Sequence, residues 1–225
     1  RDRVIDRVTE VLTGNGFFET ITLSLVDDKL ATLFNPRPIG KMLHIDHDKF
    51  SQLKSLRQSL IPSLLNARRH NERQGSFNAK LFEIASVFLG ADPGNPETEP
   101  KSVGFVTGQS FAEVKGLLLA IAQRVNPTST ISVRSSEAVG FVEGRGAEVL
   151  LNGQFWGWLG ELDRSVTDQL DLRDQLVGRM LIEFLARFGL QALELIERQH
   201  LTRRPRIEAL EAQKQRRALM HQVGP

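Results

Sequence analysis

The side chains best suited to bind a metal gather in one short segment, His44-Ile45-Asp46-His47-Asp48. On a strand, residues three apart point to opposite faces, whereas on a loop the two imidazoles could converge. A zinc site needs at least three protein ligands, and the sequence itself places no third ligand here. We therefore predict a loop or a solvated edge at this segment and no metal site.

Carboxylate pairs that could serve acid–base catalysis occur at three places. Asp27-Asp28, Asp46/Asp48 and Glu97/Glu99 lie near turn residues or proline, so that solvated loop charge is the simpler interpretation. The chain has no HExxH motif, Walker loop or nucleophile elbow, and the glycines of residues 140–146 lack the GxGxxG spacing. From the residues alone we predict no catalytic residue, no cofactor-binding residue and no metal ligand.

Positive charge is concentrated near the C-terminus, although the net charge of the chain is only +2. We predict that residues 189–225 form a basic helical tail that follows a domain at residues 1–188. A solvated tail is the favoured interpretation, and contact with RNA phosphates is the alternative. The candidate RNA contacts are Arg203, Arg204, Arg206, Lys214, Arg216 and Arg217.

The composition is that of a globular protein. Hydrophobic residues make up 40% of the 225 residues and charged residues 25%, which excludes a disordered chain or a coiled-coil rod. The absence of cysteine excludes disulfides, cysteine zinc sites and thiol nucleophiles, and it fits a reducing, cytoplasmic location. No apolar run approaches the roughly 18 residues of a membrane helix. Because the chain begins with Arg1, we expect a piece of something longer.

Apolar spacing predicts three main helices that could position these side chains. The first spans residues 4–12 and ends at Gly14-Asn15-Gly16, where glycine and asparagine tolerate the left-handed conformation. The second follows Ser59, which is a good N-cap, and has Pro62 in its first turn. The third covers residues 114–125 and ends at Asn126-Pro127.

Period-2 patterns predict strands between these helices. The expected strands are residues 17–26, 80–89, 103–106, 131–134, 148–151, 154–159 and 179–185. Asn152-Gly153 is a strong hairpin signal, and Asp163 could cap a short helix. Trp156 and Trp158 are expected on one side of their strand, in core or interface packing. Strands joined by tight turns predict an α+β fold, an antiparallel sheet flanked by helices.

Three segments carry an ordered set of motifs. The first is Arg3–Val26, with its helix, Asn15-Gly16-Phe17-Phe18-Glu19-Thr20 and strand. The second runs from Asn35-Pro36 through residues 56–65 (LRQSLIPSLL) and Asn71 to Leu81-Phe82-Glu83-Ile84. The third comprises Phe111, Lys115-Gly116, Gly144-Arg145-Gly146-Ala147, Gly157 and Gly160-Glu161-Leu162. Over residues 1–188 this set resembles the beta subunit of phenylalanyl-tRNA synthetase, a class II aminoacyl-tRNA synthetase-like family.

The resemblance implies a non-catalytic scaffold within a ligase complex. Such a beta subunit pairs with a catalytic alpha subunit in an (αβ)₂ assembly that attaches phenylalanine to tRNA(Phe), with ATP and Mg²⁺ bound by the alpha subunit. A working site needs an arginine after the strand at residues 80–89 to clamp phosphate, and this sequence has Leu89 there. The alternatives are a free-standing class II-like ATP-dependent ligase and an RNA-binding fragment acting through the basic tail.

The family's interface is expected to involve the first helix, the strand that follows it and the start of the second helix. Glu83 lies among apolar neighbours and therefore needs a hydrogen-bonded or arginine partner, for which Arg57 is a candidate. Packing within this chain's own core is the alternative for each residue, because cores and obligate interfaces share composition. The predicted interface residues are Val4, Val8, Val11, Gly16, Phe17, Glu19, Arg57, Ser59, Leu60, Pro62, Asn71 and Glu83.

Overall fold

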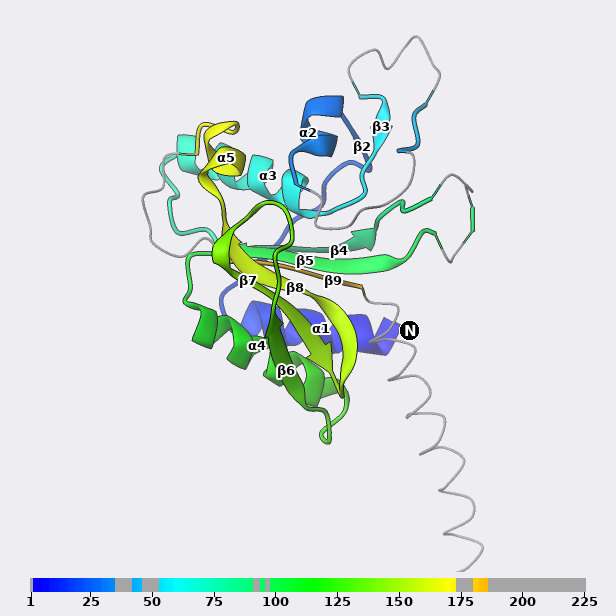
Figure 1. Ribbon diagram of the computed structural model, residues 1–225, viewed down its shortest axis with the longest axis vertical. Coiled ribbons are helices and arrows are strands. Elements are labelled where there is room, and N and C mark those ends of the chain that lie inside the picture. Colours follow the sequence, from blue (N-terminus) through cyan, green and yellow to red (C-terminus); the bar gives the residue numbers. More distant parts are fainter. Residues whose placement is uncertain are drawn as a thin grey trace, which may run out of the picture.

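The computed structural model describes residues 2–34, 42–45, 53–90, 94–95, 98–172 and 180–185 (Figure 1). The helices in this part are α1 (Asp2–Gly14), α2 (Asp28–Thr32), α3 (Ile61–Arg73), α4 (Phe111–Val125) and α5 (Arg164–Asp168). The strands are β1 (Phe18–Glu19), β2 (Leu25–Val26), β3 (Ser55–Leu56), β4 (Leu81–Ser86), β5 (Lys101–Thr107), β6 (Ile131–Ser135), β7 (Phe141–Leu151), β8 (Gln154–Leu162) and β9 (Met180–Leu185).

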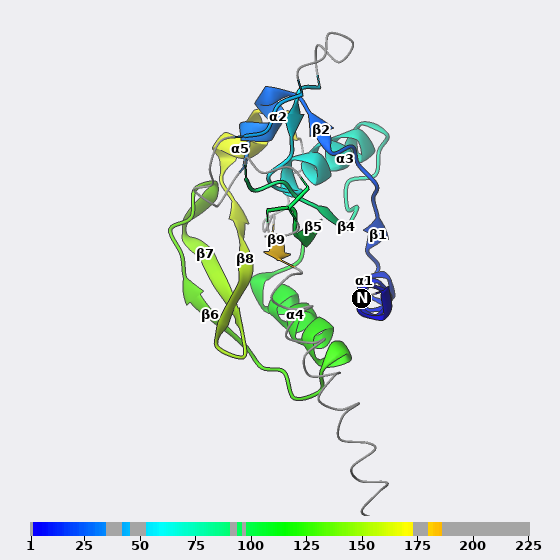
Figure 2. The ribbon, with the colours of Figure 1, turned by 90° about the vertical axis from the view of Figure 1, so that its right-hand side faces the viewer.

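Within the described residues, the strands form a seven-stranded sheet in the order β1-β4-β5-β9-β8-β7-β6, and β2 pairs with β3 in a small second sheet. Every pair in the large sheet is antiparallel except β1 with β4, which is parallel. Helices α1 and α4 lie on one side of this sheet, and α2, α3 and α5 lie on the other (Figures 1 and 2). The predicted α+β fold is therefore confirmed.

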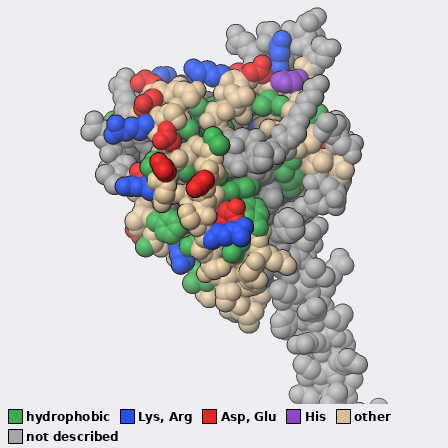
Figure 3. All heavy atoms as spheres, in the orientation of Figure 1, with side chains coloured by type: hydrophobic (Ala, Val, Ile, Leu, Met, Phe, Trp, Pro, Cys, Tyr) green, Lys and Arg blue, Asp and Glu red, His purple; other side chains and the backbone are tan. Residues whose placement is uncertain are grey.

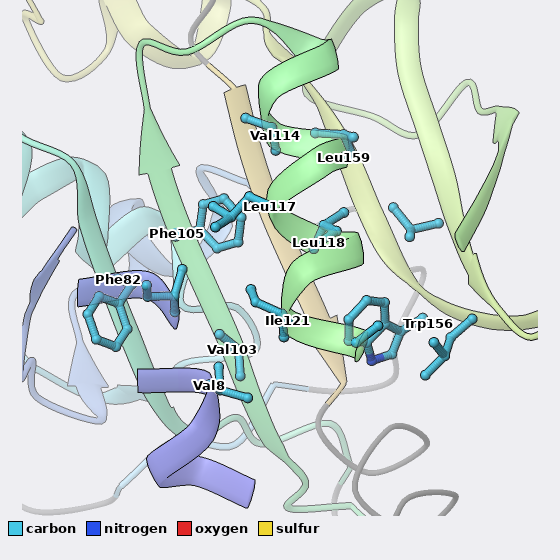
Figure 4. Packing of buried hydrophobic residues seen from close by; sticks show 14 of the residues in the cluster. Val8, Phe82, Val103, Phe105, Val114, Leu117, Leu118, Ile121, Trp156 and Leu159 are labelled. Carbon is cyan, nitrogen blue, oxygen red and sulfur yellow. The ribbon is translucent and has the colours of Figure 1, made fainter. Parts of the chain in front are cut away.

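The first hydrophobic core lies between the sheet and the α1–α4 pair. Leu118 and Ile121 of α4 are fully buried against the sheet, where Phe105 of β5 contributes its ring (Figure 4). Phe17, which follows α1 after Asn15 and Gly16, packs edge-on against Phe105 with ring centroids 5.2 Å apart. Burying such side chains contributes about 1.5–3 kcal/mol each, so this core holds α1 and the chain after it in place.

The second core lies on the opposite face, where α3 packs on β5. Leu60, Ile61 and Leu64 are fully buried there. The close approach depends on Gly104 of β5, because a Cβ at that position would lie only 3.0 Å from the Cβ of Leu60. A sheet with both faces covered explains why residues 80–89 are apolar in both registers.

Several local predictions are confirmed. Asn152 and Gly153 have φ angles of 51° and 81°, the left-handed values that a type I′ turn requires, and they join β7 to β8. Asp163 caps α5 by accepting a hydrogen bond from the backbone N–H of Ser165. Gly16, with φ 80°, follows the end of α1. These signals depend on neighbours in sequence, which is why they could be found without tertiary information.

The prediction of one strand over residues 17–26 is wrong. Only Phe18–Glu19 and Leu25–Val26 are strands, and the residues between them have no strand structure. The backbone N–H of Phe18 donates to the carbonyl of Lys80, just before β4, and that of Thr20 donates to the carbonyl of Phe82 in β4. The N–H of Thr22 donates instead to the side chain of Glu83. A buried carboxylate therefore interrupts the backbone ladder that the alternating pattern predicted.

Two further predictions need correction. Helix α3 begins one residue later than expected, so that Leu60 is the N-cap, although Ser59 Oγ still accepts from the N–H of Ile61 at 3.2 Å. Trp156 and Trp158 do not share a side: Trp156 is buried in the first core, while Trp158 packs against Phe155. A register shift in β8 at Trp156 breaks the strict alternation of faces.

Candidate functional site

A buried polar network joins three segments beside the edge of the sheet. Arg57 Nη1 donates to Glu83 Oε1 at 2.9 Å, and the two side chains are only 3% and 4% exposed. Thr22 completes the network, because its Oγ1 donates to Glu83 Oε2 at 2.7 Å and accepts from Arg57 Nη1 at 2.7 Å. The predicted pairing of Glu83 with Arg57 is confirmed.

The network exists because β4 places a carboxylate among apolar residues. Phe82 is fully buried and Ile84 packs against the first core, so the intervening Glu83 is removed from water as well. A buried charge is tolerated only when it is paired and hydrogen-bonded. Arg57 supplies the cation, and its Nε also donates to the carbonyl of Ser86 at 3.3 Å, which ties the approach to α3 to the end of β4.

This network fixes a short segment, Phe18–Leu23, that exposes large apolar side chains. Phe18 is 68% exposed, Ile21 93% and Leu23 67%. On one side the segment is held by the backbone bonds of Phe18 and Thr20 to Lys80 and Phe82 and by the bonds of Thr22 to Glu83. Clustered exposed apolar residues of this kind mark an interaction surface.

The same segment lies at the edge of the large sheet. Among the described strands, β1 pairs only with β4, so its outer side has no strand neighbour. Figure 2 shows β1 at the margin of the molecule, next to α1. An open edge next to exposed apolar side chains promotes association with another chain. We call the surface formed by residues 18–23 and this edge the edge surface.

The predicted interface residues are distributed around the edge surface, and most are not exposed on it. Gly16 and Glu19 are exposed, and Asn71 is half-buried. Val11 is partly buried and packs against the first core. The remaining eight are buried in this chain: Val4, Val8, Phe17, Arg57, Ser59, Leu60, Pro62 and Glu83. For these eight, the alternative of core packing describes their burial here, and of them Arg57 and Glu83 hold the edge surface through Thr22.

Sequence reasoning missed the exposed residues themselves. In a regular strand over residues 17–26, Ile21 and Leu23 would lie on the same side as Phe17, which is buried. Their apolar character was the available signal, but an alternating pattern does not distinguish a face that packs inside the chain from a face left open. Exposure depends on what packs against the segment, and this is a property of the whole fold.

A second polar cluster joins Asp28, His44 and Ser55 beside α2. The hydroxyl of Ser55 donates to Asp28 Oδ1 and lies 3.0 Å from His44 Nδ1, and the same Nδ1 is 3.7 Å from Asp28 Oδ1. In a nucleophilic triad the histidine uses one ring nitrogen for the serine and the other for the carboxylate, whereas here both contacts involve Nδ1. The cluster therefore lacks the geometry of a serine nucleophile.

The described residues include no group of three or more His, Cys, Asp or Glu side chains that could hold a metal ion. Asp46, His47 and Asp48, the other polar residues of the candidate metal segment, lie outside the described residues, as does the predicted basic tail with its RNA contacts. On the face shown in Figure 3, lysine and arginine side chains are interspersed with acidic ones and form no extended basic patch in the described part.

Leu89 is the residue at which the resemblance led us to expect a phosphate-binding arginine in a working site. Its side chain packs against the second core, and its N–H donates to the carbonyl of Thr98 at 2.7 Å. An alkyl side chain provides neither charge nor hydrogen bonds for a phosphate. Leu89 therefore stabilises the fold at this position and cannot act as a phosphate clamp.

Two carboxyl groups have altered acidity, and both belong to helix caps. Hydrogen bonds from the Ser110 side chain and backbone lower the pKa of Glu113 at the start of α4. Hydrogen bonds from the Ser165 side chain and backbone lower the pKa of Asp163 at the start of α5. Both groups are thus held as carboxylates, which suits capping and not proton transfer near neutral pH.

The comparison with known proteins identifies the family. A family model described as the phenylalanyl tRNA synthetase beta chain CLM domain matches residues 1–180. The chain belongs to this family. One relative is the phenylalanine–tRNA ligase beta subunit of Rhodopirellula baltica, which is 30% identical over 79% of this chain and 28% of the relative. Another is the phenylalanine–tRNA ligase beta subunit of Staphylococcus epidermidis, which is 33% identical over 74% of this chain and 22% of the relative. The chain spans less than a third of the length of these curated relatives.

Solved structures show that this beta-chain domain has the class II synthetase fold. Two structures of pyrrolysyl tRNA synthetase from Desulfitobacterium hafniense superimpose with TM-scores of 0.64 and 0.67, at 15% and 14% sequence identity. They cover 87% and 85% of this chain, and 66% and 68% of the matched chains. Within the described residues, no helix combines the length and the apolar character needed to cross a membrane.

Proposed function

We propose that this chain is a non-catalytic scaffold of a phenylalanine–tRNA ligase, and that it docks a catalytic alpha subunit through the edge surface. Membership of the beta-chain family supports the choice of partner. The exposure of Phe18, Ile21 and Leu23 beside an open sheet edge is the observation that carries the proposal, because a partner that covers them removes apolar area from water.

The division of labour within the complex follows from the same proposal. The alpha subunit binds ATP and Mg²⁺, activates phenylalanine and charges tRNA(Phe), while this chain contributes structure within an (αβ)₂ assembly in the cytoplasm. Leu89 supports a role without nucleotide binding, because the side chain expected to grip phosphate is an alkyl group packed against the core. The apolar core beneath the edge surface supports a rigid docking face, since Phe17 is buried there.

The first prediction concerns Ile21, the most exposed residue of the edge surface. Replacing Ile21 with Asp places a charge in the proposed interface while leaving the core untouched, because the side chain is 93% exposed. We expect the affinity for the alpha subunit to fall roughly 30-fold or more, the effect of losing a central interface residue. The measurement is co-purification with the alpha subunit, followed by affinity determination and a tRNA-charging assay.

Val139 provides the matched control. It is also apolar and is 81% exposed, but it lies in the connection between β6 and β7 and not at the edge surface. Val139→Asp should leave association and charging unchanged. Equal loss with both variants, or full association of Ile21→Asp, would show that the edge surface is not the docking site.

A further inference from the structure

A cavity of about 750 Å³ lies between the start of α4 and strands β6, β7 and β8. Residues from three separate motifs line it, namely Phe111, the stretch 144–147 and Glu161. The docking proposal uses none of these residues. The volume falls in the range of roughly 300–1,000 Å³ that is typical of small-molecule sites.

The cavity is shaped by an irregularity in β7. Phe141 pairs with Leu162 and Gly146 with Gly160, so the four residues 142–145 stand opposite Glu161 alone. Gly144 in this bulge has φ 71°, a backbone conformation that favours glycine. Bulges of this kind redirect side chains near binding sites. Here the bulge contains Arg145, which lines the cavity and donates from Nη1 to Glu161 Oε2 at 2.5 Å.

Two cations, Arg134 and Arg145, and two anions, Glu113 and Glu161, line the cavity. Among its contacts with the described residues, Arg145 has the one ion pair with Glu161, which leaves other N–H groups of its planar fork for a second carboxylate. Glu113 accepts both hydrogen bonds from Ser110 on Oε2, and the Gln109 side chain also donates to its carboxylate. Hydrogen bonds from Ser110 lower the pKa of Glu113, so the group is anionic at neutral pH. Phe111, Val133 and Ala147 add apolar lining.

This charge pattern selects among classes of ligand. A polyanion such as RNA would meet the carboxylates of Glu113 and Glu161, and the capping box of Ser110 and Glu113 already satisfies the start of α4. A polycation would meet Arg134 and Arg145. A small zwitterion with an apolar group can satisfy both signs and cover the apolar lining.

We propose that this cavity binds a free α-amino acid with an apolar side chain. The ligand carboxylate pairs with Arg145, its ammonium group pairs with Glu113, and its side chain lies against Phe111. This inference is independent of docking to an alpha subunit. It adds a ligand site on the α4 side of the sheet, whereas the edge surface lies at β1.

The test is calorimetric titration of the 225-residue chain with L-leucine. Leucine avoids confusion with the phenylalanine of the proposed charging reaction. Two analogues with a single charge, 4-methylpentanoate and 3-methylbutylamine, isolate the contribution of each charged group. We expect saturable binding of leucine and binding at least about tenfold weaker for either analogue, since each loses a charge-assisted hydrogen bond. Adenosine monophosphate serves as the nucleotide probe and should not compete with leucine for binding.

Substitutions test whether leucine binds in this cavity. Arg145→Gln and Glu113→Gln should each weaken leucine binding about tenfold or more. Glu113→Gln is informative because glutamine can also complete a capping box, so the helix start is retained while the charge is lost. The control is Arg124→Gln, which removes an exposed ion pair with Glu10 on α4 and α1 and should leave binding unchanged. Circular dichroism establishes that each variant is folded.

Three outcomes would overturn the proposal. The first is no saturable binding of leucine to the wild-type chain. The second is leucine binding that is unchanged in Arg145→Gln and Glu113→Gln. The third is competition by adenosine monophosphate together with analogue binding as tight as that of leucine, which would point to a site that does not read both charges.

Discussion

Glu83 shows how one buried side chain can set the shape of a neighbouring segment. Its carboxylate receives Arg57 on one oxygen and the hydroxyl of Thr22 on the other, and it also accepts from the N–H of Thr22 at 3.3 Å. These bonds replace the backbone pairing that a regular strand would have had beyond Thr20. The exposed residues of the edge surface are therefore fixed from beneath by a charge pair and not by a β-ladder.

Removing only one partner of the Arg57–Glu83 pair should strongly destabilise the fold. Arg57→Met leaves the Glu83 carboxylate buried without its cation, and we expect the free energy of unfolding to fall by about 3–5 kcal/mol. Adding Glu83→Leu to Arg57→Met removes the uncompensated charge and should recover a large part of the loss. Urea unfolding near neutral pH measures both. A double variant no more stable than Arg57→Met would contradict this account.

Gly160 illustrates a steric requirement within the sheet. A Cβ at this position would lie 2.4 Å from Cδ1 of Phe141, so the ring must move before alanine can be accommodated. We expect Gly160→Ala to destabilise the protein by about 1–3 kcal/mol, as overpacked core substitutions do. Gly116 in α4 is the matched control, because a Cβ there would have no neighbouring atom within 4 Å. Gly116→Ala should stabilise the helix by roughly 0.5–1 kcal/mol. Thermal unfolding measures the stability of both variants. Similar changes in stability for Gly160→Ala and Gly116→Ala would contradict the steric explanation.

At the scale of elements, α4 combines packing with a well-formed start. Ser110 and Glu113 exchange hydrogen bonds in a capping box, while Leu118 and Ile121 bury the other face of the helix. Polar groups thus define where the helix begins, and apolar groups attach it to the sheet. The spacing of Val114, Leu117, Leu118 and Ile121 was sufficient to predict this helix because its burial follows one regular stripe.

The capping box predicts a pH-dependent contribution to stability. The pKa of Glu113 is lowered in the folded protein, so its stabilising effect is present above the pKa of the unfolded chain and is lost as the pH falls through the folded value. We expect Glu113→Gln to be less stable than the wild type at neutral pH, with the difference shrinking as acidification protonates Glu113. Unfolding free energies measured across this range provide the check, and a constant difference would contradict the assignment.

The elements also show where prediction from sequence succeeds and where it fails. Helices α1 and α4 and the Asn152-Gly153 hairpin were predictable because periodicity and turn chemistry are local. The strand expected over residues 17–26 was not, because its pairing depends on Glu83, which is 61 residues from Thr22 in the sequence. In the candidate site, Arg57 and Glu83 could be paired from charge in apolar surroundings. The exposure of Ile21 could not be foreseen, since it depends on what the fold leaves uncovered.

At the scale of the whole molecule, the chain has a synthetase fold, and Leu89 stands where we expected a phosphate-binding arginine. The sheet and its two helical layers resemble pyrrolysyl tRNA synthetase structures. Leu89 packs against the second core. Arg57 lies near Leu89, because the N–H of the neighbouring Phe88 donates to the Arg57 carbonyl. The side chain of Arg57 is already paired with Glu83. Arg57 is thus engaged in holding the edge surface.

The last prediction follows from this arrangement. The isolated chain should show no phenylalanine-dependent ATP–pyrophosphate exchange above the background without protein, because phosphoryl charge has to be matched by positioned cations and Leu89 supplies none. Addition of the alpha subunit should produce exchange, and the complex with Ile21→Asp should show less of it at limiting concentrations because less complex forms. Exchange by the chain alone, at a rate that adding the alpha subunit does not raise, would refute the scaffold role while leaving the fold and the family membership intact.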